Sequence, residues 1–132
     1  MLFHTMIGSN DIERSKRFYN EVLGVLGMGE ATPNIADSGH TRLIYGNGAG
    51  TNFIVTQPIN DEPATVANGA TVAFSCDSPE QVKRLHDVAV SAGGTSIEAA
   101  PGPRDTANMG TIELAYFRDP DGNKLCGIHF PN

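Results

Sequence analysis

The pattern of apolar and polar residues at the start of the chain predicts a strand followed by an amphipathic helix. Residues 2–8 alternate loosely between apolar and polar side chains, which is typical of a half-buried strand. Asn10 and Glu13 have the spacing of a helix-capping box, and one apolar stripe continues to about Leu23. Beyond a glycine-rich end to the helix, the pattern predicts a hairpin around a turn at 46–50, with strands at residues 30–36, 40–45 and 51–57.

A second strand and helix begin about halfway along the chain. Residues 70–76 predict the strand. Asp77 or Ser78 caps the following helix, and Pro79 lies in its first turn. A pair of glycines then ends this helix. The remaining pattern predicts three strands and one long loop, with the strands at residues 95–100, 111–117 and 124–130 and the loop at 101–110.

The two strand–helix pairs repeat at a constant separation. His4 corresponds to Thr71 and Lys16 to Lys83, because 71 − 4 and 83 − 16 both give 67. A unit this short cannot bury its apolar face alone, so we expect the two copies to pack together around a shared space. We therefore predict an α+β fold of two βαβββ modules in tandem, forming a curved mixed sheet around a cavity. The chain then divides, within one compact domain, into a first module at 1–57, a linker at 58–69 and a second module at 70–132.

The composition and charge of the chain argue against two classes of binding partner, nucleic acids and membranes. The chain has 132 residues, a formal net charge of −6 and no run of basic residues, which argues against nucleic acid as a partner. No apolar stretch approaches the roughly 20 residues that cross a bilayer, and the N-terminus lacks the charged region of a signal peptide. We therefore expect no membrane partner and a cytoplasmic location. The two cysteines, Cys76 and Cys126, are not closely spaced, and we expect them to be reduced and buried.

One segment near the end of the chain carries a specific pattern. Residues 117–125 read Phe-Arg-Asp-Pro-Asp-Gly-Asn-Lys-Leu, and they match closely the turn before the last strand of a known family. His4 in the opening strand and Phe18-Tyr19 ahead of Leu23-Gly24 also fit. Over nearly its whole length the chain resembles the vicinal oxygen chelate superfamily, which includes glyoxalase I, extradiol dioxygenases and the fosfomycin- and bleomycin-resistance proteins. This resemblance is specific for the fold and says little about the reaction.

The resemblance implies a position for one divalent metal, held by four side chains from four strands. The matching positions in this chain are His4, Ile54, Thr71 and Cys126, and only His4 is a residue of the usual kind. Asn52 has the same strand parity as Ile54 but is also neutral. One histidine with a hydroxyl and a thiol is a poor ligand set for magnesium, manganese or nickel. We therefore predict no cofactor and no metal at these positions, with a divalent metal as the alternative.

Two other histidines could restore a metal site. His129 has the opposite strand parity to Cys126, unless Gly127 marks a β-bulge that changes the phase of the strand. His40 lies at the edge of a strand in the first module. We expect both histidines to face away from the cavity, although the sequence leaves this question open.

Strand parity predicts which side chains line the cavity between the modules. If His4 points inward, residues of the same parity on the other strands do so too, while the larger apolar residues pack beneath the helices. Arg104 lies in a loop that borders the cavity mouth in the family, and it is a candidate clamp for a carboxylate or phosphate. Pairing with Asp105 is the competing explanation for this arginine. The ligand-binding residues that we predict are His4, Met6, Asn52, Ile54, Thr71, Ser75, Arg104, Tyr116 and Cys126.

Two functions fit these expectations. The first is binding of a small, partly apolar, oxygen-bearing ligand in the inter-module cavity without the usual four-ligand metal site, and the missing ligands favour it. The second is a metal-dependent lyase or dioxygenase of the glyoxalase kind with a rearranged metal site. We also expect a homodimer, as in the family. Because a linker of about 12 residues permits either arrangement, the modules could pair within one chain or across the dimer.

Overall fold

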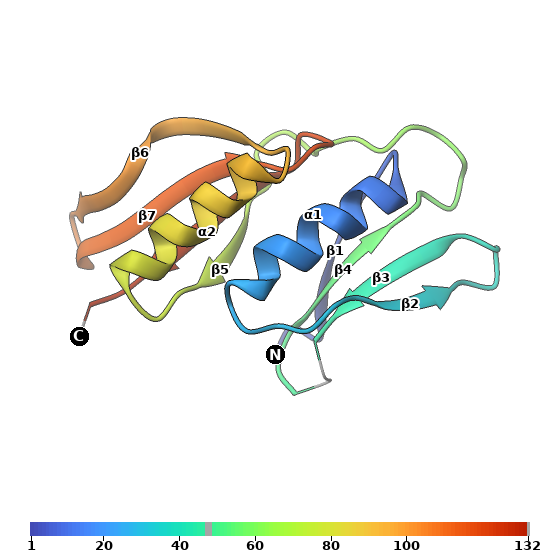
Figure 1. Cartoon of the computed structure of the whole chain (residues 1–132), viewed down its shortest axis with the longest axis horizontal. Helices are drawn as coiled ribbons and strands as arrows, with labels where there is room; N and C mark the ends of the chain where they lie inside the picture. The colour runs from blue at the N-terminus through green and yellow to red at the C-terminus, as the bar shows by residue number, and fades with distance from the viewer. Residues whose placement is uncertain (47–48, 132) are drawn as a thin grey trace.

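The structure is a computed structural model, and it describes residues 1–46 and 49–131 (Figure 1). The first half contains β1 (His4–Gly8), α1 (Ile12–Gly24), β2 (Thr32–Ile35), β3 (Thr41–Tyr45) and β4 (Asn52–Thr56). The second half contains β5 (Val72–Ser75), α2 (Pro79–Ser91), β6 (Thr95–Thr106), β7 (Gly110–Arg118) and β8 (Lys124–His129). Each half therefore has the order βαβββ, which confirms the predicted fold class. Residues 47 and 48 of the predicted turn lie outside the described residues.

The eight strands form two separate four-stranded sheets rather than one continuous sheet. Their strand orders are β1-β4-β3-β2 and β5-β8-β7-β6, so the two sheets have the same topology. In each sheet the opening strand pairs in parallel with the closing strand, and the other pairings are antiparallel. The helices α1 and α2 lie side by side over the sheets, and they pack against each other within one chain (Figure 1).

Each helix is capped by the side chain of the residue directly before it. Asp11, not Asn10, caps α1, because its carboxylate accepts the backbone N–H of Arg14. The side chain of Asn10 instead bonds to the backbone of Ala64 in the linker, so the prediction of Asn10 as the cap was wrong. Ser78 caps α2 by accepting the backbone N–H of Gln81.

The predicted long loop at residues 101–110 was also wrong. Strand β6 continues to Thr106, and β7 already begins at Gly110. The two prolines of this segment suggested a loop, but β6 is an edge strand, where a missing backbone N–H is tolerated. The register slips between Ile97 and Gly102, so the intervening residues 98–101 form a bulge in β6.

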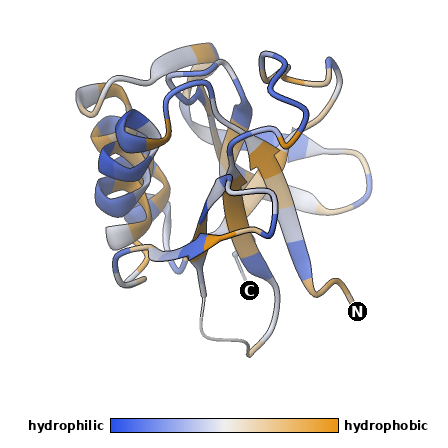
Figure 2. Cartoon of the chain, turned by 90° about the vertical axis from the view of Figure 1, so that its right-hand side faces the viewer, coloured by the Kyte–Doolittle hydropathy of each residue, from blue (hydrophilic) through white to orange (hydrophobic). Residues whose placement is uncertain are grey.

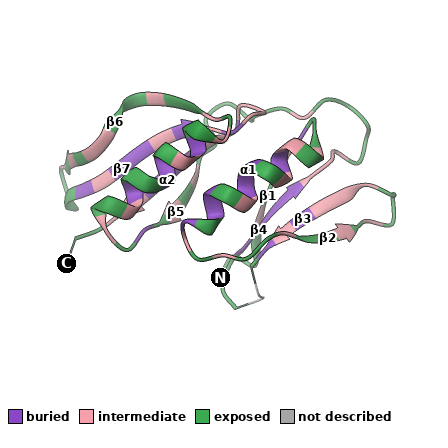
Figure 3. Ribbon diagram, in the orientation of Figure 1, coloured by how far each residue is buried: buried purple, intermediate pink, exposed green. Residues whose placement is uncertain are grey.

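One hydrophobic core lies between the helices and the sheets. The helix-facing side chains of both modules form a single cluster that includes Phe18, Val22, Phe53, Leu85 and Phe117. Phe53 of β4 and Phe74 of β5 are in edge-to-face contact, with ring centroids 5.2 Å apart, so the core is continuous across the two sheets. The hydrophobic colour gathers in the strands and on the helix faces turned toward them (Figure 2). Buried residues alternate with exposed ones along both helices (Figure 3).

Asp119, in the turn between β7 and β8, ties the second module to the first. Its side chain is buried and accepts the hydroxyl of Tyr19 at 2.5 Å and the side-chain amide of Asn123 at 2.9 Å. Asn123 also donates to the backbone carbonyl of Gly8 at the end of β1. Burial raises the pKa of Asp119, and hydrogen bonds from Tyr19 and Asn123 oppose that rise.

Asp121, in the same turn, makes further contacts with the start of α1. Its carboxylate accepts the backbone N–H of Asn10, the guanidinium of Arg14 at 2.9 Å and the hydroxyl of Ser15 at 3.2 Å. The segment that carries the family resemblance therefore holds the two modules together.

Among the described residues, no helix is long and apolar enough to cross a membrane.

Candidate functional site

Each sheet has an open face, turned away from the helices, and the predicted ligand-binding residues are distributed over the two open faces. In the first sheet His4 pairs with Asn52, and Met6 pairs with Ile54, so these four side chains share one face. His4 and Met6 are exposed there, whereas Asn52 and Ile54 are buried. On β1, the exposed part of this face is therefore one imidazole and one thioether.

The open face of the second sheet carries two rows of side chains. One row runs from Ala73 through Cys126 to Tyr116, and a parallel row runs from Ser75 through Ile128 to Leu114. Cys126 and Leu114 form a small hydrophobic cluster with Ile112, against which Tyr116 and Ile128 pack. This face offers an apolar wall with a phenol hydroxyl and a serine hydroxyl at its margins.

Cys126 is not suited to act as a nucleophile. The residue is 2 % exposed, and burial raises the pKa of its thiol to about 11. Its sulfur donates to the carbonyl of Gly127 at 3.4 Å. Because the thiolate is the reactive form, a thiol held protonated in this way is inert at neutral pH. Cys76 is also a free, buried cysteine, and burial raises its pKa as well.

Arg104 does not point into open space. Its guanidinium donates to the carbonyls of Gly102 and Pro103 on its own strand, and to those of Ala99 and Ala100 in the bulge of β6. Asp105 does not pair with it but accepts the hydroxyl of Thr111. The geometry therefore assigns Arg104 to the bulge, and it does not support the predicted role of anion clamp or the competing pair with Asp105.

The four positions that correspond to metal ligands in the family lie on different sheets. His4 and Ile54 belong to the first sheet, and Cys126 belongs to the second, with Thr71 directly before β5. In residues 1–46 and 49–131, no group of three or more His, Cys, Asp or Glu side chains is placed to hold a metal ion. The absence of a bound metal stays a prediction.

The other histidines are engaged elsewhere. His129 bonds to the carbonyl of Cys76, and the regular pairing of β8 with β7 shows no bulge at Gly127. His40 lies between Ser38 and Asp61, with its Nε2 atom 2.7 Å from a carboxylate oxygen of Asp61. His129 has the opposite parity to Cys126 on β8, and His40 lies outside the strands, so neither restores the four-ligand site.

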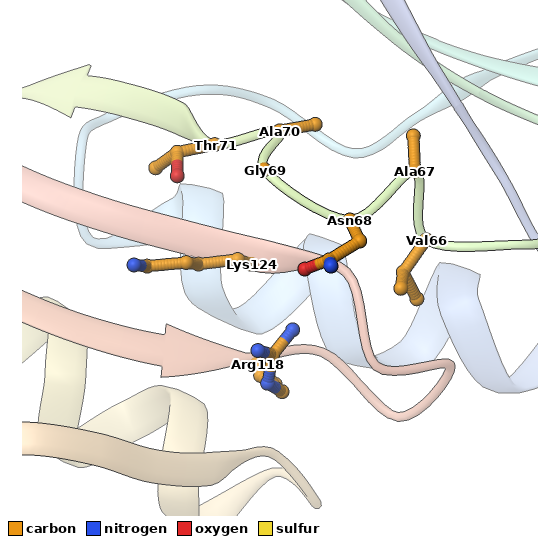
Figure 4. A pocket seen from close by; sticks show the side chains of 8 residues that line it. All are labelled: Val66, Ala67, Asn68, Gly69, Ala70, Thr71, Arg118 and Lys124. Atoms are coloured by element: carbon orange, nitrogen blue, oxygen red, sulfur yellow. The ribbon is translucent and has the colours of Figure 1, made fainter.

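A cavity that was not predicted from the sequence lies at one end of the second sheet's open face. The cavity has a volume of about 170 Å³ and is lined by linker residues 66–71 together with Arg118 and Lys124 (Figure 4). Thr71 is the one predicted site residue that lines it. Hairpin pairing could have revealed the two basic residues, because Arg118 and Lys124 flank the predicted turn and therefore face each other on one side of the sheet.

Paired βαβββ modules with an open face on each sheet define a protein of the glyoxalase-like fold class. The model of the Glyoxalase/Bleomycin resistance protein/Dioxygenase superfamily matches residues 1–126, and the chain belongs to this superfamily.

Individual relatives agree with this assignment. A crystal structure of a glyoxalase/bleomycin resistance protein from Albidiferax ferrireducens T118 is 45% identical, with a TM-score of 0.88 and 98% of each chain covered. The protein named Glyoxalase 1 from Caenorhabditis elegans is 25% identical over 127 residues, which cover 96% of this chain but only 42% of that protein. Glyoxalase I from Zea mays is 23% identical with a TM-score of 0.71, covering 96% of this chain and 44% of that one, and this likeness shows the fold alone.

Proposed function

We propose that this chain binds a small, partly apolar ligand with an oxygen group in the space above the open faces of its two modules, without a four-ligand metal site. The support for the ligand class is the make-up of these faces. Apolar wall residues such as Leu114 and Ile128 supply contact area, and isolated polar groups such as Tyr116, Ser75 and His4 supply orientation.

The main support for the absence of a four-ligand metal site is the chemistry of two equivalent positions. Ile54 and Cys126 occupy the same place in the closing strands of the two sheets, and both side chains are buried. Ile54 has no donor atom, and Cys126 would have to lose a proton whose pKa is raised to about 11. A metal at these positions would have only one ligand of the usual kind, His4, and its binding to Cys126 would require the removal of a tightly held proton.

Elemental analysis of protein purified without chelators tests the metal part. We expect well under one equivalent of any divalent metal, and no change in content on His4→Ala substitution. His40→Ala is the matched control, because it removes a histidine that lies off the open faces. About one metal per chain, lost in His4→Ala and kept in His40→Ala, would contradict the proposal and favour a metal-dependent lyase or dioxygenase.

We further propose that the chain acts as a homodimer. Several apolar side chains at the N-terminus and on β1 are exposed, with Leu2 at 60%, Phe3 at 70% and Met6 at 40%. A twofold interface would cover such a patch, and closed dimers are the commonest assembly of soluble proteins. Light scattering at micromolar concentration should give a dimer mass, and Met6→Glu should lower it. A monomer mass for the unmodified chain would contradict this part.

A further inference from the structure

The cavity at the end of the second sheet has a composition unlike the rest of this acidic chain. Both charged side chains that line it, Arg118 and Lys124, are basic, whereas the whole chain has a formal net charge of −6. Of the acidic residues close by in sequence, Asp119 and Asp121 are occupied by Tyr19 and by the start of α1, and Glu98 of β6 pairs with Lys124. The charged side chains that line the cavity are therefore both cations, and one of them is paired with Glu98, which lies outside the lining.

The guanidinium of Arg118 is held in position by one hydrogen bond, and its other N–H groups remain available. Its Nη1 atom donates to the carbonyl of Gly122 at 2.7 Å, which ties the guanidinium to the turn. In the part of the chain that the structure describes, its other donors have no hydrogen-bond partner. A pre-positioned guanidinium with free donors is the usual partner of a carboxylate or a phosphate.

Lys124 links the cavity to the apolar face. Its ammonium lies 4.6 Å from the centre of the Tyr116 ring and 2.5 Å from a carboxylate oxygen of Glu98, in the bulge of β6. Glu98 is half exposed, and its backbone has a positive φ of 60°. An anion in the cavity would therefore compete with Glu98 for the same ammonium group.

The linker supplies neutral polar groups on the opposite wall (Figure 4). Among the described residues, the side chains of Asn68 and Thr71 have no hydrogen-bond partner. The backbone N–H of Ala70 donates to the carbonyl of Ala67 at 2.8 Å, and Gly69 has a φ of +100°. This is the geometry of a β-turn that needs glycine at its third position, so the linker has a defined shape over the cavity.

We propose that the cavity formed by the linker, Arg118 and Lys124 binds the carboxylate or phosphate group of the ligand. The inference rests on the proposed function, since it assigns the apolar part of the same ligand to the row that begins at Tyr116. A cavity of about 170 Å³ is smaller than the sites that enclose whole drug-sized molecules, and it suits one anionic group. Lys124 spans the two parts, because its ammonium lies over the Tyr116 ring.

The test is a titration of the unmodified chain with inorganic phosphate and, separately, with benzoate, at constant ionic strength. Backbone amide signals in NMR spectra report the position of each probe. We expect both probes to shift the signals of Asn68, Gly69 and Ala70, and benzoate to shift those of Leu114 and Ile128 as well. If benzoate shifts Leu114 and Ile128 but only phosphate shifts the linker signals, the cavity takes a phosphate ester; if only benzoate shifts the linker signals, the cavity takes a carboxylate.

Matched variants separate the local effect from the overall charge. Lys124→Gln should weaken both probes by at least about tenfold, because it removes a charge-assisted hydrogen bond. Arg17→Gln changes the net charge by the same amount on the exposed side of α1, and it should change the affinity less than about twofold. Glu98→Gln frees Lys124 and should tighten binding about threefold.

Three results decide between this inference and the proposed function. Unmoved signals at Asn68–Ala70, or equal weakening by Lys124→Gln and Arg17→Gln, would overturn the anion site. Benzoate that shifts Leu114 and Ile128 with unchanged affinity in Lys124→Gln would overturn the anion site and leave the proposed function standing. Phosphate bound at the linker, with Leu114 and Ile128 insensitive to benzoate, would support the anion site and contradict the proposed function.

Discussion

The same position of the repeat is used in two different ways by the two modules. Tyr19 in α1 and His86 in α2 are 67 residues apart, since 86 − 19 gives 67, and both are buried beneath their helices. Tyr19 donates to Asp119 of the other module, whereas His86 bonds to Ser96 of its own module. The two copies thus share a fold, but the first helix carries the contact that holds the modules together.

The open faces differ in a similar way. In the first sheet the edge strand β2 has four residues, and His4 and Met6 on the opposite edge strand are exposed. In the second sheet the edge strand β6 has 12 residues and runs along β7, where Ile112 and Leu114 are buried. The second module therefore carries the formed apolar wall and the basic cavity, and the first module contributes the exposed histidine. The two modules therefore share a topology but differ in the surfaces that they expose.

Removal of the Asp119 carboxylate should give the largest effect on this comparison. Asp119→Ala leaves the buried hydroxyl of Tyr19 without its acceptor and removes one of the two acceptors of the Asn123 side-chain amide, so the free energy of unfolding should fall by about 3–5 kcal/mol. Urea denaturation followed by circular dichroism measures this change. Asp37→Ala is the control, because Asp37 is exposed, and it should change stability by less than about 0.5 kcal/mol. Equal stability of the two variants would show that the turn does not hold the modules together.

The equivalent substitutions at Tyr19 and His86 test the asymmetry directly. Burial holds the pKa of Tyr19 well above its usual range, so the hydroxyl is a permanent donor to Asp119. Tyr19→Phe should cost about 1.5–3 kcal/mol, because it removes a hydrogen bond to a buried carboxyl group. His86→Phe should cost about 1 kcal/mol or less, because Ser96 is exposed and can bond to water. Amide exchange should speed up in both modules for Tyr19→Phe, and a larger effect of His86→Phe would reverse the comparison.

Arg104 tests a feature that only the second module has. Arg104→Met should lower stability by about 1–2 kcal/mol, because four carbonyl groups of β6 lose a charged donor and partly recover bonds to water. Thermal unfolding measures this loss, and Arg84→Met on the exposed face of α2 is the control. The affinity for phosphate should stay within about twofold of the unmodified chain. A tenfold weaker phosphate affinity would return Arg104 to the role of anion clamp.

The smallest expected effect concerns the pH dependence contributed by Cys126. Burial raises the pKa of its thiol from 9.0 to about 11, so the folded state keeps a proton that the unfolded state loses. Its contribution is fully present below pH 9 and is lost as the pH rises toward about 11. By pH 10 the unmodified chain should lose about 1 kcal/mol more stability than Cys126→Val. Parallel urea titrations at pH 8 and pH 10 measure the difference, and identical pH dependence would show that the thiol is accessible in the folded state.

Several features of the fold were determined by the sequence alone. They follow from patterns among residues that are close together along the chain. Strand parity placed His4, Met6, Asn52 and Ile54 on one face, because successive side chains of a strand point to opposite sides. The repeat predicted two modules of equal topology, and the structure confirms them. Periodicity depends only on neighbours a few residues away, so it can be recognised in one sequence.

Other features were decided only by the tertiary structure. The bond between Tyr19 and Asp119 joins residues 100 positions apart, and neither residue type announces its partner. Arg104 could have been a clamp or an ion pair, but the bulge of β6 placed four carbonyl groups within reach of its guanidinium. The basic cavity needed the linker to lie over the β7–β8 hairpin. Such contacts depend on how whole elements pack and on which polar groups packing leaves without a hydrogen-bond partner. Local sequence patterns contain neither kind of information.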